Sequence, residues 1–150
     1  MFRGKFDHNV DLKGRLSVPS KFREYLKERE ENTLVMTNSI SNGERFLDIF
    51  PLYRWEEIEK KVSTLSQVKT EVQNFQRYYL SQASDSHLDK AGRILIPSGL
   101  REYAGLEKEV VVVGMLNKIE LWSKEKWERI FKKAEEDFEN IMLSLSEMGL

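Results

Sequence analysis

The sequence repeats itself: residues 11–25 read DLKGRLSVPSKFREY, and residues 89–103 read DKAGRILIPSGLREY. At this fixed offset of 78 residues, eight of the fifteen positions are identical, and they include a Gly, a Pro and the closing Arg-Glu-Tyr. A match of this quality indicates an internal repeat, because self-similarity at a constant spacing is the signature of a duplicated structural unit. We therefore expect the chain to fold as two copies of one unit.

The residue types inside the repeat predict its local structure. Gly14 and Gly92 stand where a tight turn between strands needs a residue that accepts a positive φ. The aliphatic residues after each glycine favour a strand, and Pro19 and Pro97 then favour the start of a short helix. Each half is expected to run strand, tight turn, strand, short helix, two strands and a longer helix.

A second match sets the limits of the two repeats. Residues 47–51 resemble residues 119–123, but here the offset is 72, so the first half carries about six extra residues. These residues fall most naturally in 38–44, where Ser, Asn and Gly indicate a loop. We assign the first repeat to residues 1–78 and the second, with a C-terminal helix, to residues 79–150, and expect them to share one compact domain.

Apolar residues at helical spacing predict three longer helical segments. One begins at Pro51, a second spans residues 68–79, and a third begins at Ser123, which is a suitable N-cap. The third carries an apolar stripe as far as Leu145, which is long for a monomer of this size. The stripe can pack on its own half of the chain or cover a neighbouring subunit.

Composition narrows the function classes. Hydrophobic residues make up 40% and charged residues 33% of the chain, which is typical of a folded globular protein. The chain has no Cys and two His, and no glycine-rich phosphate loop or zinc-protease motif, so we expect no enzyme activity, no cofactor and no metal. No apolar stretch of signal-peptide length occurs at the N-terminus, so the expected location is the cytoplasm.

Charge is distributed unevenly along the chain. The formal net charge is −1, yet residues 1–29 hold eight basic and four acidic residues, a net charge of +4. Residues 120–150 hold five basic and eight acidic residues, a net charge of −3. A basic end can provide an electrostatic footprint for nucleic acid on one face of an otherwise acidic protein.

These motifs resemble the MraZ family and its AbrB-like, swapped-hairpin relatives. The resemblance rests on the opening residues MFRG, on Asp-x-x-Gly-Arg occurring twice at this spacing, and on two Pro-led helices that end in Arg-Glu-Tyr. It implies an α+β fold in which two pseudo-symmetric hairpin and helix repeats form a swapped-hairpin β-barrel core with flanking helices. It also implies a ring-like homo-oligomer that regulates transcription at the nucleoid. Its target would be short direct repeats in double-stranded DNA, in the promoter of the division and cell-wall gene cluster.

The candidate DNA-binding residues are those of the first turn and of the strand before it: Arg3, Lys5, Lys13, Gly14 and Arg15. A two-stranded ribbon fits the major groove of B-DNA, where Arg15 could bind a guanine edge and Lys13 a phosphate. Gly14 would let the backbone come close to the duplex. Neighbours in a ring face the same way round, so they suit direct repeats about one helical turn apart.

Other polar residues of the repeat are expected to have structural or inter-subunit roles: Asp11, Asp89, Gly92 and Arg93. Phosphate repels carboxylates, so Asp11 is expected to pair with Arg15 or with a neighbour, which leaves Arg15 either a DNA ligand or a structural partner. We favour DNA for Arg15. We expect Arg23 and Arg101 to pair with nearby acids. A protein-binding scaffold or an antitoxin-like partner with no specific DNA role remains the alternative function.

Overall fold

A computed structural model describes all residues from 1 to 150 and confirms the predicted order of elements in each half. The first half contains β1 (Lys5–Asn9), β2 (Arg15–Ser17), α1 (Ser20–Glu28), β3 (Thr33–Ser41), β4 (Glu44–Pro51) and α2 (Leu52–Ser63). The second half contains β5 (Ser84–His87), β6 (Arg93–Leu95), α4 (Ser98–Ala104), β7 (Glu109–Met115), β8 (Lys118–Ser123) and α5 (Lys124–Glu136). Helix α3 (Thr70–Phe75) and a π-helical turn (Gln76–Leu80) join the halves, and α6 (Phe138–Glu147) follows α5.

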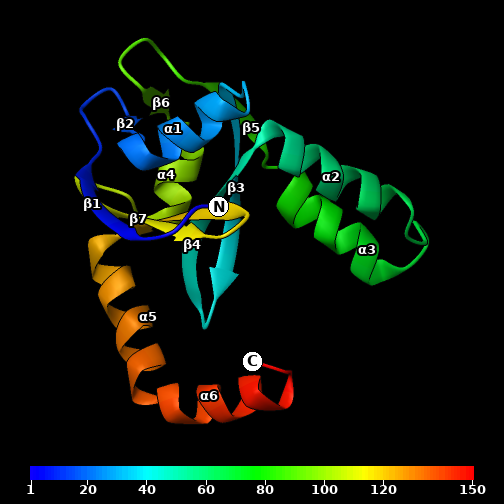
Figure 1. Cartoon of the computed structure of the whole chain (residues 1–150). Coiled ribbons are helices and arrows are strands. Elements are labelled where there is room, and N and C mark those ends of the chain that lie inside the picture. The colour runs from blue at the N-terminus through cyan, green and yellow to red at the C-terminus, as the bar shows by residue number, and fades with distance from the viewer.

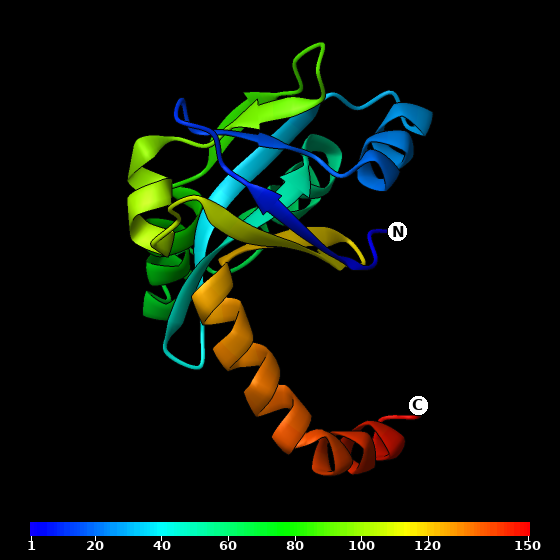
Figure 2. The same ribbon diagram turned by 90° about the vertical axis from the view of Figure 1, so that its left-hand side faces the viewer.

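The two halves exchange strands. Six strands form one antiparallel sheet in the order β1-β7-β8-β4-β3-β5, so β1 pairs with a strand of the second half and β5 with a strand of the first. Strands β2 and β6 form a separate two-stranded ribbon. The α+β class is confirmed, but the six-stranded sheet stays open, with β1 and β5 at its edges, instead of closing into a barrel (Figure 2).

A pseudo-twofold axis relates the halves. In the β2–β6 ribbon, Leu16 lies opposite Ile94, its own equivalent at the offset of 78. In the middle of the sheet, Asp48 lies opposite Glu120, its equivalent at the offset of 72. Each repeat therefore contributes the same elements to both layers, as a duplicated sequence requires.

The main core lies between the inner face of the sheet, the ribbon and the two short helices. Leu16 and Ile94 are both almost completely buried in it, together with Phe22 of α1 and Leu100 of α4. Burying one such side chain contributes about 1.5–3 kcal/mol. The inward residues of the ribbon thus anchor it, while its alternate residues face outward.

The outer face of the sheet carries two smaller apolar clusters, one for each half. Val35, Phe50 and Trp55 form the first beneath α2, and Phe46, Val111, Val113 and Trp122 form the second beneath α5. Phe50 and Trp122 thus occupy equivalent places in the two clusters, as the sequence match predicts. Between the clusters, the buried Asp48 accepts a hydrogen bond from Lys118 Nζ at 2.7 Å.

The predicted C-terminal helix is interrupted. Ser123 caps it as expected, since its Oγ accepts a hydrogen bond from the backbone N–H of Lys126 at 3.3 Å. At Asp137, however, φ is −104° and ψ is 8°, and the chain changes direction into α6. Helix α6 lies at the far end of α5, away from the sheet (Figure 1). None of the helices combines the length and apolarity that a membrane crossing requires.

Candidate nucleic-acid interface

The carboxylate of Asp11 organises the first turn. Its Oδ1 atom accepts hydrogen bonds from the backbone N–H groups of Lys13 and Arg15, both at 2.9 Å. Its Oδ2 atom accepts a third from Arg15 Nε at 2.8 Å. The backbone N–H of Arg15 is the main cause that lowers the pKa of Asp11 below its ordinary value. The turn is therefore rigid, and one edge of the Arg15 guanidinium is tied to it.

The second turn has the same construction. Asp89 Oδ1 accepts hydrogen bonds from the backbone N–H groups of Ala91 and Arg93, and its Oδ2 accepts one from Arg93 Nε, all at 2.9 Å. The pKa of Asp89 is lowered for the same first reason, the backbone N–H of Arg93. The two turns differ in where they carry an exposed lysine: Ala91 stands in the place of Lys13, and the second turn carries Lys90 one residue earlier, where the first turn has Leu12.

The ribbon joins the two turns into one surface. The backbone N–H of Ile96 donates to the Gly14 carbonyl at 2.8 Å, and that of Val18 donates to the Gly92 carbonyl at 2.9 Å. Because β2 and β6 run antiparallel, the turns lie at opposite ends of the ribbon, on the same side of the molecule (Figure 2). The outward residues between them are Arg15, Ser17, Arg93 and Leu95.

Arg23 and Arg101 do not pair with acids, so that expectation is wrong. Arg101 Nε donates to the Ile96 carbonyl at 3.0 Å, and its guanidinium covers Gly14. Arg23 Nε donates to the Val18 carbonyl at 2.9 Å and covers Gly92. Each arginine thus packs on the turn of the other half, which a reading of each repeat in isolation cannot anticipate.

The five candidate DNA-binding residues do not lie together. Lys13, Gly14 and Arg15 share the first turn, but Arg3 and Lys5 lie at the opposite end of β1. β1 pairs with β7, and a single bridge, Val10 to Leu16, joins the β1 side of the turn to β2. The expectation that these five residues lie together on one hairpin ribbon is therefore wrong. Gly14 is buried beneath Arg101, so its lack of a side chain makes room for that residue.

The strand exchange brings two further cations to the first turn. Lys108 and Arg101, both from the second half, line one hollow together with two acids, Asp11 and Glu107. The Lys108 carbonyl accepts a hydrogen bond from the backbone N–H of Val10 at 2.8 Å, which fixes the loop beside the turn. No local motif marks Lys108, because its proximity to the turn follows from the exchange alone.

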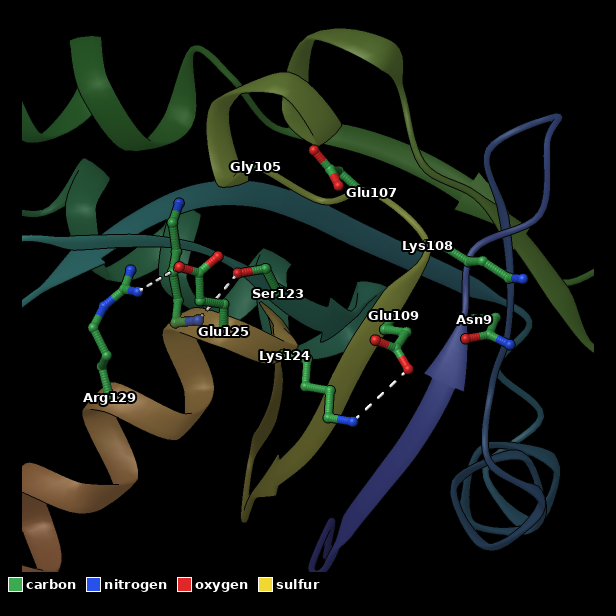
Figure 3. Close-up of a pocket in the computed structure, with 10 residues that line it drawn as sticks. Asn9, Gly105, Glu107, Lys108, Glu109, Ser123, Lys124, Glu125 and Arg129 are labelled. Carbon is green, nitrogen blue, oxygen red and sulfur yellow. Dashed lines mark hydrogen bonds and ion pairs between the residues drawn. The ribbon is translucent and has the colours of Figure 1, made fainter.

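A polar hollow between the α4–β7 loop and the start of α5 is internally neutralised (Figure 3). Lys124 pairs with Glu109 at 3.8 Å, and Arg129 pairs with Glu125 at 3.2 Å. Lys126 Nζ donates to the Ala104 carbonyl at 2.9 Å. The hydrogen bond of Lys126 fastens α5 to the domain, and three acids beside the four cations of the lining leave the hollow little net charge to attract an anion such as phosphate.

Comparison with known proteins places these features in a family. The family model described as "MraZ protein, putative antitoxin-like" matches residues 1–78 and again residues 79–144. Proteins named "Transcriptional regulator MraZ" from Desulforamulus reducens and Natranaerobius thermophilus are each 43% identical to this chain over 141 residues, which is 94% of both sequences compared. The protein of the same name from Halothermothrix orenii is 39% identical over 150 residues, the full length of both.

Proposed function

The chain belongs to the MraZ family, and on that premise we propose that it is a transcriptional regulator that binds double-stranded DNA through its first turn. The names of its relatives support the regulatory role. The proposed contact surface consists of Lys13 and Arg15, with Lys108 beside them. Arg3 and Lys5 are left out of it, because the length of β1 separates them from the turn.

The observation that carries this proposal is the way in which Arg15 is held, with Lys13 two residues away; Arg93 is held in the same way, but Ala91 stands in the place of that lysine. Asp11 takes its Nε, while no hydrogen bond within the chain engages its two Nη atoms, and the side chain is 31% exposed. A guanidinium with a free pair of donors matches the O6 and N7 acceptors of guanine in the major groove. Because the aspartate already fixes its orientation, little side-chain entropy is lost on binding.

Lys13 adds an exposed cation at the tip of the turn, suited to a phosphate oxygen. In this proposal the second turn serves the fold or a subunit contact, with Asp89, Gly92 and Arg93 as its structural residues. Asp11 acts indirectly, by holding Arg15. Its negative charge is compensated by the three hydrogen bonds that it accepts.

A single turn neutralises few phosphates and would bind weakly. We therefore include in the proposal a ring-like homo-oligomer that engages several short direct repeats at once, so that each further contact benefits from a high effective concentration. The promoter of the division and cell-wall gene cluster is the target that the family resemblance implies.

Matched substitutions in the two turns test the assignment. Arg15→Ala and Arg93→Ala remove the same ion pair from equivalent turns, so any effect on folding should be similar. In a mobility-shift assay on promoter repeats at about 50 mM and about 200 mM salt, Arg15→Ala should abolish the shift and Arg93→Ala should retain it. Light scattering should show an unchanged oligomer for both variants.

Retained binding by Arg15→Ala would end the assignment to the first turn. The "antitoxin-like" wording of the family description favours a protein partner as the second candidate function. If the wild-type protein shifts no promoter fragment even at the lower salt concentration, the DNA proposal fails and that candidate replaces it.

A further inference from the structure

The two outer clusters are built from equivalent residues. Val35 and Val111 lie opposite Phe50 and Trp122, respectively, in matching strand pairs. On the other side, the two valines lie opposite Asp85 and Asp7 of the edge strands. Trp55 of α2 and Trp127 of α5, related by the offset of 72, pack on these strands. We therefore expect a similar segment to pack on each of the two clusters.

The first cluster is covered by a second helical segment. Tyr79 and Leu80, from the π-helical turn after α3, pack against it. The ring centroids of Tyr79 and Trp55 are 5.6 Å apart, and Trp55 is only 4% exposed. Helix α3 runs beside α2 in a helical hairpin (Figure 1), so the chain itself fills this position.

The equivalent position in the second half is an open groove. It has a volume of about 240 Å³ and lies between β1 and α5. Its lining consists of three apolar and four charged residues: Val111, Trp127, Phe131, Lys5, Asp7, Lys124 and Glu128. The Phe131 ring packs at a tilt against Trp127, with ring centroids 5.8 Å apart, yet 54% of its surface is exposed. No segment of the chain occupies the place that the π-helical turn takes in the first half.

Helix α6 has the composition to fill such a groove but cannot reach its own. Phe138, Ile141, Met142 and Leu145 lie at helical spacing, and 42% of Met142 is exposed. An antiparallel helical hairpin needs a loop of about 2–5 residues. The chain has residues 64–69 between α2 and α3, but only Asp137 between α5 and α6. Helix α6 is therefore directed away from the sheet.

The two lysines of the groove favour an acidic partner, while Asp7 and Glu128 bring the formal charge of its lining to zero. Residues 135–150 contain five acidic residues and no basic ones. The rim of the groove carries Lys5 and Lys124, whose ion pairs to Asp7 and Glu109 are long, at 3.5 and 3.8 Å. Exposed pairs of this kind are worth little, so both ammonium groups can turn towards an acidic partner.

We propose that α6 of one copy of this chain docks in the groove between β1 and α5 of a second copy. There it takes the place that the helical segment after α3 fills in the first half. The contact joins two different surfaces, so it repeats head to tail and can close into a ring. This inference rests on the homo-oligomer of the proposed function and specifies its interface.

Two single substitutions and their mixture test the inference without DNA. Phe131→Asp damages the groove and Met142→Asp damages α6, both at exposed positions where folding should be preserved. Each variant alone should give the mass of one chain, 17.7 kDa, by light scattering. An equimolar mixture should give twice that mass, because one intact groove meets one intact α6. Val68→Asp, at an exposed residue of the α2–α3 loop, is the control and should keep the wild-type mass.

Three results would overturn the inference: a wild-type mass for either groove or helix variant, a mixture that stays monomeric although circular dichroism shows folded chains, or a loss of assembly in Val68→Asp. If α6 paired with α6 instead, Phe131→Asp would keep the wild-type mass and Met142→Asp alone would be monomeric. Arg15→Ala keeps both surfaces and should retain the wild-type mass. A failure of DNA binding therefore stays distinguishable from a failure of docking.

Discussion

The guanidinium of Arg101 lies against Gly14, in the space that a side chain at position 14 would need. A Cβ atom at Gly14 would stand 2.8 Å from Arg101 Cζ, and one at Gly92 would stand 2.5 Å from Arg23 Cδ. In each case the arginine and the glycine come from different halves. The two repeats are thereby locked together through both turns, of which the first carries the proposed DNA ligands.

We predict that Gly14→Ala destabilises the fold by about 2–3 kcal/mol. Its φ is +81°, which costs a residue with a Cβ atom about 1 kcal/mol, and displacement of the Arg101 guanidinium, which breaks its hydrogen bond to the Ile96 carbonyl, adds the rest. Gly43→Ala is the matched control, since its φ is +76° but no atom lies within 4 Å of the added Cβ. That variant should lose only about 1 kcal/mol in urea unfolding. Equal losses in the two variants would contradict the collision.

Removal of the arginine should relieve the collision. Arg101→Ala introduced into Gly14→Ala should recover part of the lost free energy of unfolding, whereas Arg101→Ala in the wild-type chain should destabilise it. A double-mutant cycle measures this coupling. Additive losses would show that Arg101 moves aside at no cost, and the lock between the halves would then be weak.

The sequence predicts the local structure of each repeat better than it predicts the contacts between the two repeats. Gly14, Gly92, Pro19 and Pro97 have local backbone roles, so each turn and short helix could be placed from its own residues. The cover of Gly14 by Arg101 and the position of Lys108 depend on the strand exchange, which brings distant segments together. The turn at Asp137 was also missed, because the apolar spacing continues through it and no Gly or Pro marks the break.

The Asp11 carboxyl should make stability depend on pH in the acid range. The pKa of Asp11 is lowered in the folded chain, chiefly by the Arg15 backbone N–H, so the folded state prefers the ionised form. This contribution is present above the ordinary value of 3.8 and is lost as the pH falls through the lower folded value. In thermal unfolding, Asp11→Asn should therefore have a lower Tm than the wild type at pH 6. The gap should shrink as the pH falls below 3.8.

Carboxyl resonances followed by NMR give the Asp11 pKa directly, and a value at or above 3.8 would refute the description of the turn.

Because Asp48 is buried, the stability of the fold should depend on its one cationic partner, Lys118. Its carboxylate is 3% exposed and accepts hydrogen bonds from Lys118 Nζ at 2.7 Å and from the Tyr79 hydroxyl at 2.5 Å. Lys118→Met should cost about 3 kcal/mol, because it leaves a buried charge uncompensated. Asp48→Asn combined with Lys118→Met should be more stable than Lys118→Met alone in urea unfolding. If Lys118→Met leaves the free energy of unfolding unchanged, water must reach Asp48.

The spacing of DNA repeats should control affinity if neighbouring subunits bind together. Subunits related by rotation around a ring present their first turns at a fixed interval, so the repeats must face the same side of the duplex. Inserting about five base pairs between two repeats rotates one site by half a helical turn and should reduce affinity to that of a single repeat. Inserting about ten base pairs returns both repeats to the same side of the duplex and should restore most of the affinity. Simultaneous binding of two repeats can raise the affinity about a hundredfold over that of one repeat. Mobility-shift titrations with these duplexes at one salt concentration make the comparison. Equal affinity for both insertions would mean that each first turn binds independently, and the weak contact of a single turn would then have to account for all of the recognition.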